Sequence, residues 1–184
     1  PAQDEDRQGP GVVAGKDGRF YALDAATGRE RWTATLSSRG ECGSQPIVRD
    51  ATVYLTGAGA ATGGGAAGFY LFALDASTGA ERWRVQLDDP LRPWVHLRPA
   101  TDGRLVFVGD VGCFAALSLA TGEVVWCRDD LGQRENLTSF SHPVVVGDVL
   151  VVAFAGQLPA LWGLDAATGE TRWPATDRGR SIYS

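Results

Sequence analysis

The hydrophobic residues of this chain occur in short runs that end at turn-forming residues. Residues 20–32 read FYALDAATGRERW, an apolar run followed by a polar stretch with a glycine and then by a tryptophan. In the apolar run, Tyr21 and Leu23 alternate with Phe20 and Ala22. Successive side chains of a strand point to opposite faces, so this pattern predicts a strand that is apolar on both faces, as in a sheet between two neighbours.

A turn and a returning strand follow the apolar run. Asp24 can accept hydrogen bonds from backbone N–H groups two residues further on, and Gly28 can adopt left-handed backbone geometry. Trp32 stands four residues after this glycine. Its large apolar ring and single N–H donor suit a contact between neighbouring sheets. The expected unit is therefore a β-hairpin with a tryptophan on its second strand.

This hairpin occurs four times in the chain. The other copies are LFALDASTGAERW at residues 71–83, FAALSLATGEVVW at 114–126 and LWGLDAATGETRW at 161–173. Their glycines are 51, 43 and 47 residues apart. The recurring residues are the glycines Gly28, Gly79, Gly122 and Gly169 and the tryptophans Trp32, Trp83, Trp126 and Trp173. Strand-rich repeats of about 40–50 residues indicate β-propeller blades, each a four-stranded antiparallel sheet.

Further strand signals define the expected boundaries. Residues 46–57, 99–109 and 143–152 each combine a proline, a polar turn and a β-branched run, whereas the first copy begins only at Gly11. The sequence thus predicts an all-β chain with three full blades and one partial blade. We expect a linker or disordered tail at 1–10, a partial blade at 11–39, a blade at 40–96 with a Gly/Ala-rich insertion at 57–68, a blade at 97–140, and a blade at 141–184 that includes the start of a further strand.

Four blades are at the lower limit of the ~4–8 that close a propeller. We expect the chain to be a segment of a larger ring of seven or eight blades, in which further blades cover the exposed strand edges. The alternative is a closed four-bladed ring, in which residues 181–184 complete the first blade.

The composition and charge of the chain limit the classes of partner that we expect it to bind. The net charge is -5, and the 17 Lys and Arg residues are scattered along the chain. Nucleic acid and anionic membrane both require a basic face, so neither is the expected main partner. No apolar run reaches the ~20 residues that a membrane-spanning helix needs, and we therefore expect no transmembrane segment.

The repeated pattern A-L-D-A-x-T-G-x-x-x-W resembles the tryptophan-docking motif of the pyrroloquinoline-quinone-type (PQQ-like) β-propeller repeat family. The resemblance covers essentially the whole chain after Gly11. It implies that the four recurring tryptophans pack between adjacent blades. The third copy departs from the pattern, with Ser118 and Leu119 in place of Asp-Ala, and Val124 and Val125 in place of a charged pair.

The family has several functions. It includes quinoprotein alcohol dehydrogenases, a barrel-assembly lipoprotein of the bacterial outer membrane, and extracytoplasmic sensor domains of bacterial Ser/Thr kinases. The dehydrogenases hold PQQ with a disulfide between adjacent cysteines, a stacking tryptophan and calcium. Here Cys42, Cys113 and Cys127 are far apart, and no C-x-x-C-H haem motif is present.

We therefore expect a non-enzymatic bacterial propeller that acts as a protein-interaction scaffold or a ligand-sensing domain, with no catalytic, cofactor-binding or metal-binding residues. The alternative is a segment of a dehydrogenase that uses PQQ and calcium and whose catalytic residues lie outside this chain.

Carboxylates and histidines are the remaining candidates for a metal site. The pairs at 88–89 and 129–130 could contribute oxygen ligands to calcium, but both follow a strand and precede a loop, where solvated charge is expected. His96 and His142 are 46 residues apart, close to one repeat, and no third ligand accompanies them at zinc-like spacing. We expect both histidines to lie in loops or face solvent.

The cysteines lead to one sharper prediction. Cys113 lies nine residues before Gly122 and Cys127 five after it, so a turn near 120–121 places them at or near opposed cross-strand positions. This spacing predicts a Cys113–Cys127 disulfide with Cys42 free, and two buried reduced thiols are the alternative. A disulfide would indicate an oxidising compartment, which is periplasmic, cell-surface or secreted.

The least repetitive segments are the expected binding face. Residues 57–68 and 88–97 interrupt the repeats, and such insertions map to loops on one face of a propeller. Trp94 is a contact candidate, although packing against the ring is equally consistent with the sequence. We expect a protein partner or a small ligand on this loop face.

Overall fold

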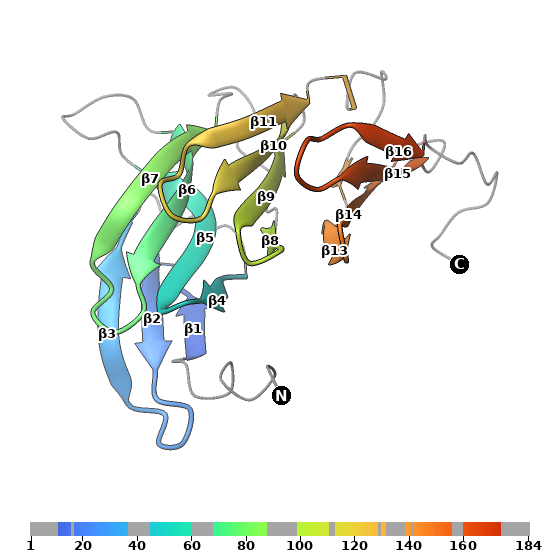
Figure 1. The fold of residues 1–184 in the computed structure, drawn as a ribbon. Helices are drawn as coiled ribbons and strands as arrows, with labels where there is room; N and C mark the ends of the chain where they lie inside the picture. The colour runs from blue at the N-terminus through green and yellow to red at the C-terminus, as the bar shows by residue number, and fades with distance from the viewer. Residues whose placement is uncertain are drawn as a thin grey trace. The chain divides into compact units, whose positions relative to one another are not determined.

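The computed structural model describes residues 11–15, 17–36, 45–59, 68–87, 99–110, 113–128, 130–131, 139–140, 142–155 and 160–173. Every regular element in these ranges is a β-strand, and the strands form four antiparallel sheets (Figure 1). The predicted all-β fold built from antiparallel blades is therefore confirmed.

The chain divides into two compact units, at residues 1–96 and 97–184, and each contains two sheets. The first sheet of the first unit, blade 1, has the order β1-β2-β3. The second, blade 2, has the order β4-β5-β6-β7. The strands of blade 1 are β1 (Gly11–Ala14), β2 (Arg19–Leu23) and β3 (Glu30–Thr35), and those of blade 2 are β4 (Ile47–Arg49), β5 (Thr52–Gly59), β6 (Gly68–Asp75) and β7 (Glu81–Leu87).

The second unit contains blade 3, with the order β11-β10-β9-β8, and blade 4, with the order β12-β14-β15-β16 and β13 also paired to β14. The strands of blade 3 are β8 (Ala100–Thr101), β9 (Leu105–Asp110), β10 (Cys113–Ser118) and β11 (Val124–Arg128). Those of blade 4 are β12 (Ser139–Phe140), β13 (Val144–Val146), β14 (Val149–Ala155), β15 (Ala160–Asp165) and β16 (Thr171–Trp173).

Two of the expected boundaries differ from those in the structure. β12 pairs with β14 and so belongs to blade 4, although the predicted third blade extended to residue 140. In blade 2, β5 continues to Gly59 and β6 begins at Gly68, so the ends of the predicted insertion at 57–68 form a strand pair instead of a loop. Residues 60–67 lie outside the described part of the chain.

Each unit has a hydrophobic core between its two sheets. In the first unit, Phe20, Trp32 and Ala34 of blade 1 are buried together with Leu55 and Phe72 of blade 2. In the second unit, the core contains Phe107, Phe114 and Trp126 of blade 3 and Leu150, Val152 and Leu164 of blade 4. Burial of both faces explains why the central strands are apolar at successive positions.

The strand register places a small residue directly opposite each recurring tryptophan. The pairs are Ala22 with Trp32, Ala73 with Trp83, Ala116 with Trp126 and Gly163 with Trp173. Directly opposed residues of an antiparallel pair share one face, so the small side chain leaves room for the indole on its own sheet. A register shift, or β-bulge, follows each of these pairs.

In blades 1, 2 and 4, the hairpin turn is held by an aspartate and an arginine. In blade 2, Asp75 Oδ1 accepts hydrogen bonds from the backbone N–H groups of Ser77 (2.9 Å) and Thr78 (3.0 Å), and its Oδ2 pairs with Arg82 at 2.7 Å. The N–H of Gly79, whose φ is 73°, donates to the Asp75 carbonyl at 2.8 Å. Asp24 pairs in the same way with Arg31, and Asp165 with Arg172.

These contacts stabilise the ionised carboxylates. The Arg31 guanidinium, together with the hydroxyl and N–H of Thr27, lowers the pKa of Asp24 to about 2. Arg82 and Ser77 likewise hold the pKa of Asp75 well below its usual range. Because the folded-state pKa is depressed, the unfolded chain binds more protons as the pH falls through this range, and the stabilisation present above the ordinary aspartate pKa of 3.8 is lost.

We expect the first unit to lose stability as the pH falls from about 5 to about 2, and the loss to be smaller in Asp75→Asn, which lacks one of the titrating carboxylates. Urea unfolding midpoints across this range measure the effect. Glu123→Gln in the blade 3 turn is the control, because no arginine pairs with Glu123 among the described residues. The same pH slope in Asp75→Asn and wild type would contradict the prediction.

Candidate functional site

The best-defined contact between two blades is made by Trp32. Its side chain is only 7% exposed, and Nε1 donates a hydrogen bond to the Ala76 carbonyl of blade 2 at 2.9 Å. The indole lies against the turn glycine of that blade, where a Cβ built on Gly79 would be 2.6 Å from Cε3 of Trp32. Position 79 therefore requires glycine both for its positive φ and for this close approach.

Trp126 makes the equivalent contact in the second unit. It is 9% exposed, and Nε1 donates to the Ala166 carbonyl of blade 4 at 3.0 Å. A Cβ on Gly169 would be 2.7 Å from Cδ2 of the indole. The neighbouring Arg128 adds a hydrogen bond of 2.6 Å from Nη1 to the Gly169 carbonyl. The same indole–glycine geometry therefore occurs in both units.

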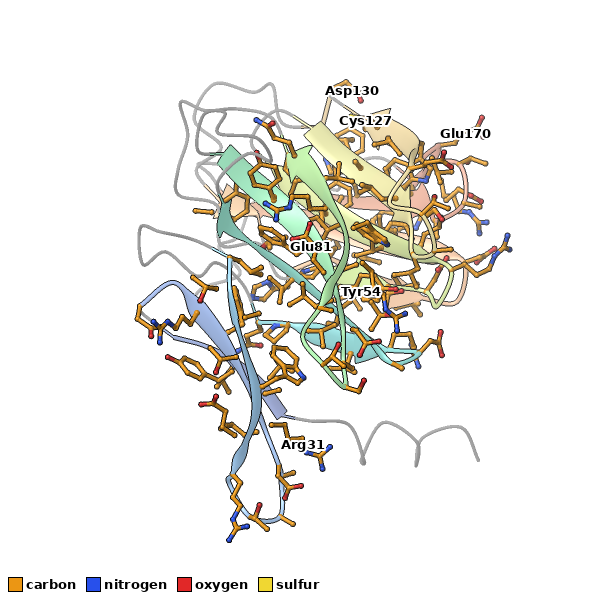
Figure 2. All side chains as sticks on the ribbon, turned by 90° about the vertical axis from the view of Figure 1, so that its left-hand side faces the viewer. Arg31, Tyr54, Glu81, Cys127, Asp130 and Glu170 are labelled. Carbon is orange, nitrogen blue, oxygen red and sulfur yellow. The ribbon has the colours of Figure 1, made fainter. Side chains whose placement is uncertain are left out.

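The other two recurring tryptophans are half-buried. The Trp83 ring is tilted against Tyr54, with the ring centroids 5.8 Å apart. Trp173 lies over Gly163 of its own blade, in direct contact with the position that a Cβ would occupy. Packing between blades is thus described for Trp32 and Trp126, and the same role for Trp83 and Trp173 stays a prediction. Figure 2 shows the side chains around these sheets, with Tyr54 labelled.

The turn glycines differ in their surroundings. Gly122 is buried with a φ of 76°, as the predicted turn requires. Gly28 has a similar φ of 69° but is exposed, and no atom of the described chain lies within 4 Å of a Cβ built there. Among the described residues, no indole packs on the blade 1 turn.

The structure shows the surroundings of some of the candidate metal ligands. Asp130 pairs with Arg128 at 2.6 Å, and this guanidinium lowers the pKa of the carboxylate. His142 is exposed, whereas His96 and residues 88–89 and 129 lie outside the described part. Within the described ranges, no three His, Cys, Asp or Glu side chains are grouped as a metal site would require. No helix there has the length and apolar character needed to cross a membrane.

Cys127 is disulfide-bonded, so the alternative of a reduced thiol is wrong for this residue. Cys42 and the side chain of Cys113 lie outside the described part. The register also corrects one step of the prediction, because Cys127 is directly opposite Ala115, and Cys113 is two positions further along β10. A Cys113–Cys127 bond would be diagonal, and it stays a prediction.

Sequence reasoning overlooked the arginines that pair with the turn aspartates, although an arginine directly before the tryptophan recurs in three copies. It also overlooked the consequence of the third copy's departure. Val125 stands in place of this arginine, and Val124 and Val125 are 56% and 51% exposed. The predicted binding loop at residues 88–97, with Trp94, lies outside the described part.

Two substitutions of Trp126 distinguish the contribution of its hydrogen bond to stability from the contribution of its packing. Trp126→Phe removes the Nε1–H donor and leaves the buried Ala166 carbonyl without this bond, so we expect a loss of about 1–3 kcal/mol in unfolding free energy. Trp126→Ala also leaves a cavity and should lose about 3–5 kcal/mol. Denaturant unfolding measures both, with the exposed Val124→Ala as a control expected within about 0.5 kcal/mol of wild type. A Trp126→Ala variant as stable as wild type would refute this account.

Known proteins resemble this chain over most of its length. It is 31% identical over 180 residues to the serine/threonine-protein kinase AfsK of Streptomyces griseus, covering 95% of this chain and 21% of the kinase. It is 31% identical over 166 residues to the outer membrane protein assembly factor BamB of Yersinia pestis, covering 83% and 38%. The chain thus spans well under half the length of these relatives.

Solved structures share the fold. BamB from Moraxella catarrhalis has a TM-score of 0.67 at 27% identity, with 91% of this chain and 50% of that chain covered. The quinohemoprotein alcohol dehydrogenase of Comamonas testosteroni has a TM-score of 0.64 at 20% identity, covering 90% and 33%. This second likeness concerns the fold alone.

A family model also matches the chain directly. It is the model of PQQ-type repeats described as outer membrane protein assembly factor BamB, and it matches residues 7–67 and 60–182. These ranges include all four hairpins with their turn glycines and tryptophans. The chain therefore belongs to the BamB-like family of PQQ-repeat β-propellers.

Proposed function

We propose that this chain is a non-enzymatic propeller module that binds extended protein segments and acts as a scaffold in bacterial outer-membrane protein assembly. The observation that carries this proposal is the apolar edge of blade 3. β11 is the terminal strand of its sheet, and its first two residues, Val124 and Val125, are both more than half exposed.

The other blades protect the same position with charge. Arg31 and Arg82 occupy the position of Val125 in blades 1 and 2, where each pairs with a turn aspartate. Charged side chains on an edge strand oppose pairing with a further strand, whereas an apolar edge can accept an extended peptide through backbone hydrogen bonds. Blade 3 is therefore the blade best suited to bind an unfolded apolar segment.

The recurring polar residues support a structural role. The turn aspartates accept backbone N–H groups and arginine guanidinium groups, and two of the four indole N–H groups donate to carbonyls of the next blade. These groups are occupied in building the blades. Family membership adds support, because BamB proteins are named for outer-membrane protein assembly.

An extracytoplasmic location is part of the proposal. A disulfide such as the one at Cys127 persists in oxidising compartments and is rare in the cytosol. The similarity to part of AfsK would also suit a ligand-sensing domain. We favour the scaffold because the exposed Val124 and Val125 fit a peptide strand better than a small polar ligand.

Fluorescence anisotropy of a labelled outer-membrane β-barrel protein, diluted from urea, tests the scaffold role. We expect saturable binding to the wild-type chain. The double change Val124→Glu/Val125→Arg gives blade 3 the charged pair of blade 2 and should weaken binding at least about tenfold, or ~1.4 kcal/mol. Its unfolding midpoint should stay unchanged, because both side chains are exposed.

The matched control is Val144→Glu, which places a charge at an equally exposed valine of blade 4 and should leave this binding unchanged. No saturable binding by the wild type, or equal binding by the double variant, would refute the scaffold proposal. Titration with PQQ and calcium tests the dehydrogenase alternative, and saturable quenching of tryptophan fluorescence would favour it.

A further inference from the structure

Glu123 is a charged residue at the start of the exposed edge of blade 3. It stands immediately before β11, and its side chain is exposed. Its backbone carbonyl accepts the Ser118 N–H at 2.8 Å, which fixes the residue where the hairpin turn becomes strand. Its Oε2 accepts a hydrogen bond of 3.2 Å from the hydroxyl of Thr121. In the part of the chain that the structure describes, no lysine, arginine or histidine forms an ion pair with this carboxylate.

A departure from the repeat explains why this carboxylate has no ion-pair partner there. In blades 1, 2 and 4, a turn carboxylate is paired with the arginine that stands directly before the tryptophan, at 2.6, 2.7 and 2.6 Å. Blade 3 has Val125 at this position, so its turn contains the Glu123 carboxylate without such an arginine. The counter-ion that the other turns supply from within is therefore missing from residues 118–125.

The nearby arginines do not replace this counter-ion. Arg128 Nη1 donates to the Gly169 carbonyl at 2.6 Å, and Arg128 Nε pairs with Asp130 at 2.6 Å. Arg104 precedes β9, and β10 separates β9 from β11 in the sheet. None of the ion pairs between described residues joins Arg104 to Glu123. The carboxylate is therefore available to a cation from outside the chain.

Glu123 adjoins an apolar strip on the edge strand. Val124 and Val125 are 56% and 51% exposed. Cys127, which Figure 2 labels, is also exposed, and it carries no charge because it is disulfide-bonded. The edge of β11 thus presents a carboxylate followed by exposed apolar groups.

An extended segment that adds to this edge meets both features at once. Directly opposed residues of an antiparallel strand pair have Cβ atoms about 4.5–5.5 Å apart, so a lysine or arginine opposite Glu123 reaches its carboxylate. Opposite charges in such cross-strand pairs are stabilising, and like charges are destabilising. The residues next to this cation in the segment then lie beside Val124 and Val125, where apolar side chains fit.

We propose that Glu123 sets the charge specificity of this edge, which selects extended apolar segments that carry a lysine or arginine directly beside their apolar residues. This inference rests on the proposed binding of extended segments at β11 and adds the charge of the segment that is bound. Glu123 supplies the counter-charge for the cation, while the backbone edge of β11 and the two valines bind the remainder of the segment.

Fluorescein-labelled peptides test this charge preference. All share the core Val-Thr-Val-Thr-Val, and they differ in the residue on both sides of the core, which is lysine, glutamine or glutamate. Because the flanks are symmetric, the comparison does not depend on the direction in which the peptide pairs with β11. In fluorescence anisotropy at low ionic strength, the wild-type chain should bind the lysine peptide at least about threefold more tightly than the glutamate peptide. Salt at about 1 M should remove most of this difference, because exposed charges are then screened.

Substitutions of Glu123 distinguish the effect of its charge from binding at the edge itself. Glu123→Gln should bind the lysine and glutamate peptides within about twofold of each other, and Glu123→Lys should bind the glutamate peptide more tightly. Both variants should bind the glutamine peptide as the wild type does, because the edge of β11 is unchanged. Glu30→Lys is the matched control, since it makes the same change of charge at an exposed carboxylate of blade 1 and should keep the wild-type preference. Circular dichroism verifies that each variant is folded.

Several results would overturn the inference and leave the scaffold proposal intact. They are equal binding of the lysine and glutamate peptides by the wild type, tighter binding of the glutamate peptide, and an unchanged preference in Glu123→Lys. Failure of all the peptides to bind would also overturn it, and binding of the unfolded barrel protein then tests the scaffold separately. If the barrel protein does not bind either, both proposals are refuted.

Discussion

The packing of an indole on a turn glycine is the contact on which the joining of blades depends. It needs a small residue opposite the tryptophan, a glycine in the facing turn and a carbonyl that accepts the indole N–H. Trp32 meets all three conditions with Ala22, Gly79 and Ala76. Because a Cβ on the glycine would overlap the ring, the contact joins sheets only where the repeat supplies glycine at that position.

The turns that present these glycines are themselves built by charge. Asp75 binds backbone N–H groups on one oxygen and Arg82 on the other, and this arrangement recurs in blades 1 and 4. In blade 3, Ser118 and Val125 replace the pair, and the Ser118 hydroxyl accepts only a 3.3 Å bond from Thr121. One departure from the repeat thus changes a charged strand edge into an apolar one.

The binding function proposed for this chain depends on the blade surfaces that are not buried in packing between blades. The same blade architecture occurs in assembly factors and in dehydrogenases, so the fold by itself does not choose between them. One such feature among the described residues is the apolar edge of β11, where Val124 and Val125 are both more than half exposed. This edge suits an extended peptide, because the edge strand of a sheet can pair with a further strand through backbone hydrogen bonds.

Sequence alone determined the strands, the turns and the repeat, because strand periodicity and turn chemistry act between residues that are near in the chain. Tertiary structure decided the rest. The bulge after Ala116 places Cys127 opposite Ala115, β12 joins blade 4, and the burial of Trp126 but not of Val144 follows from which faces meet another sheet. Register across a bulge and the covering of a face depend on residues distant in sequence, and local pattern carries no information about them.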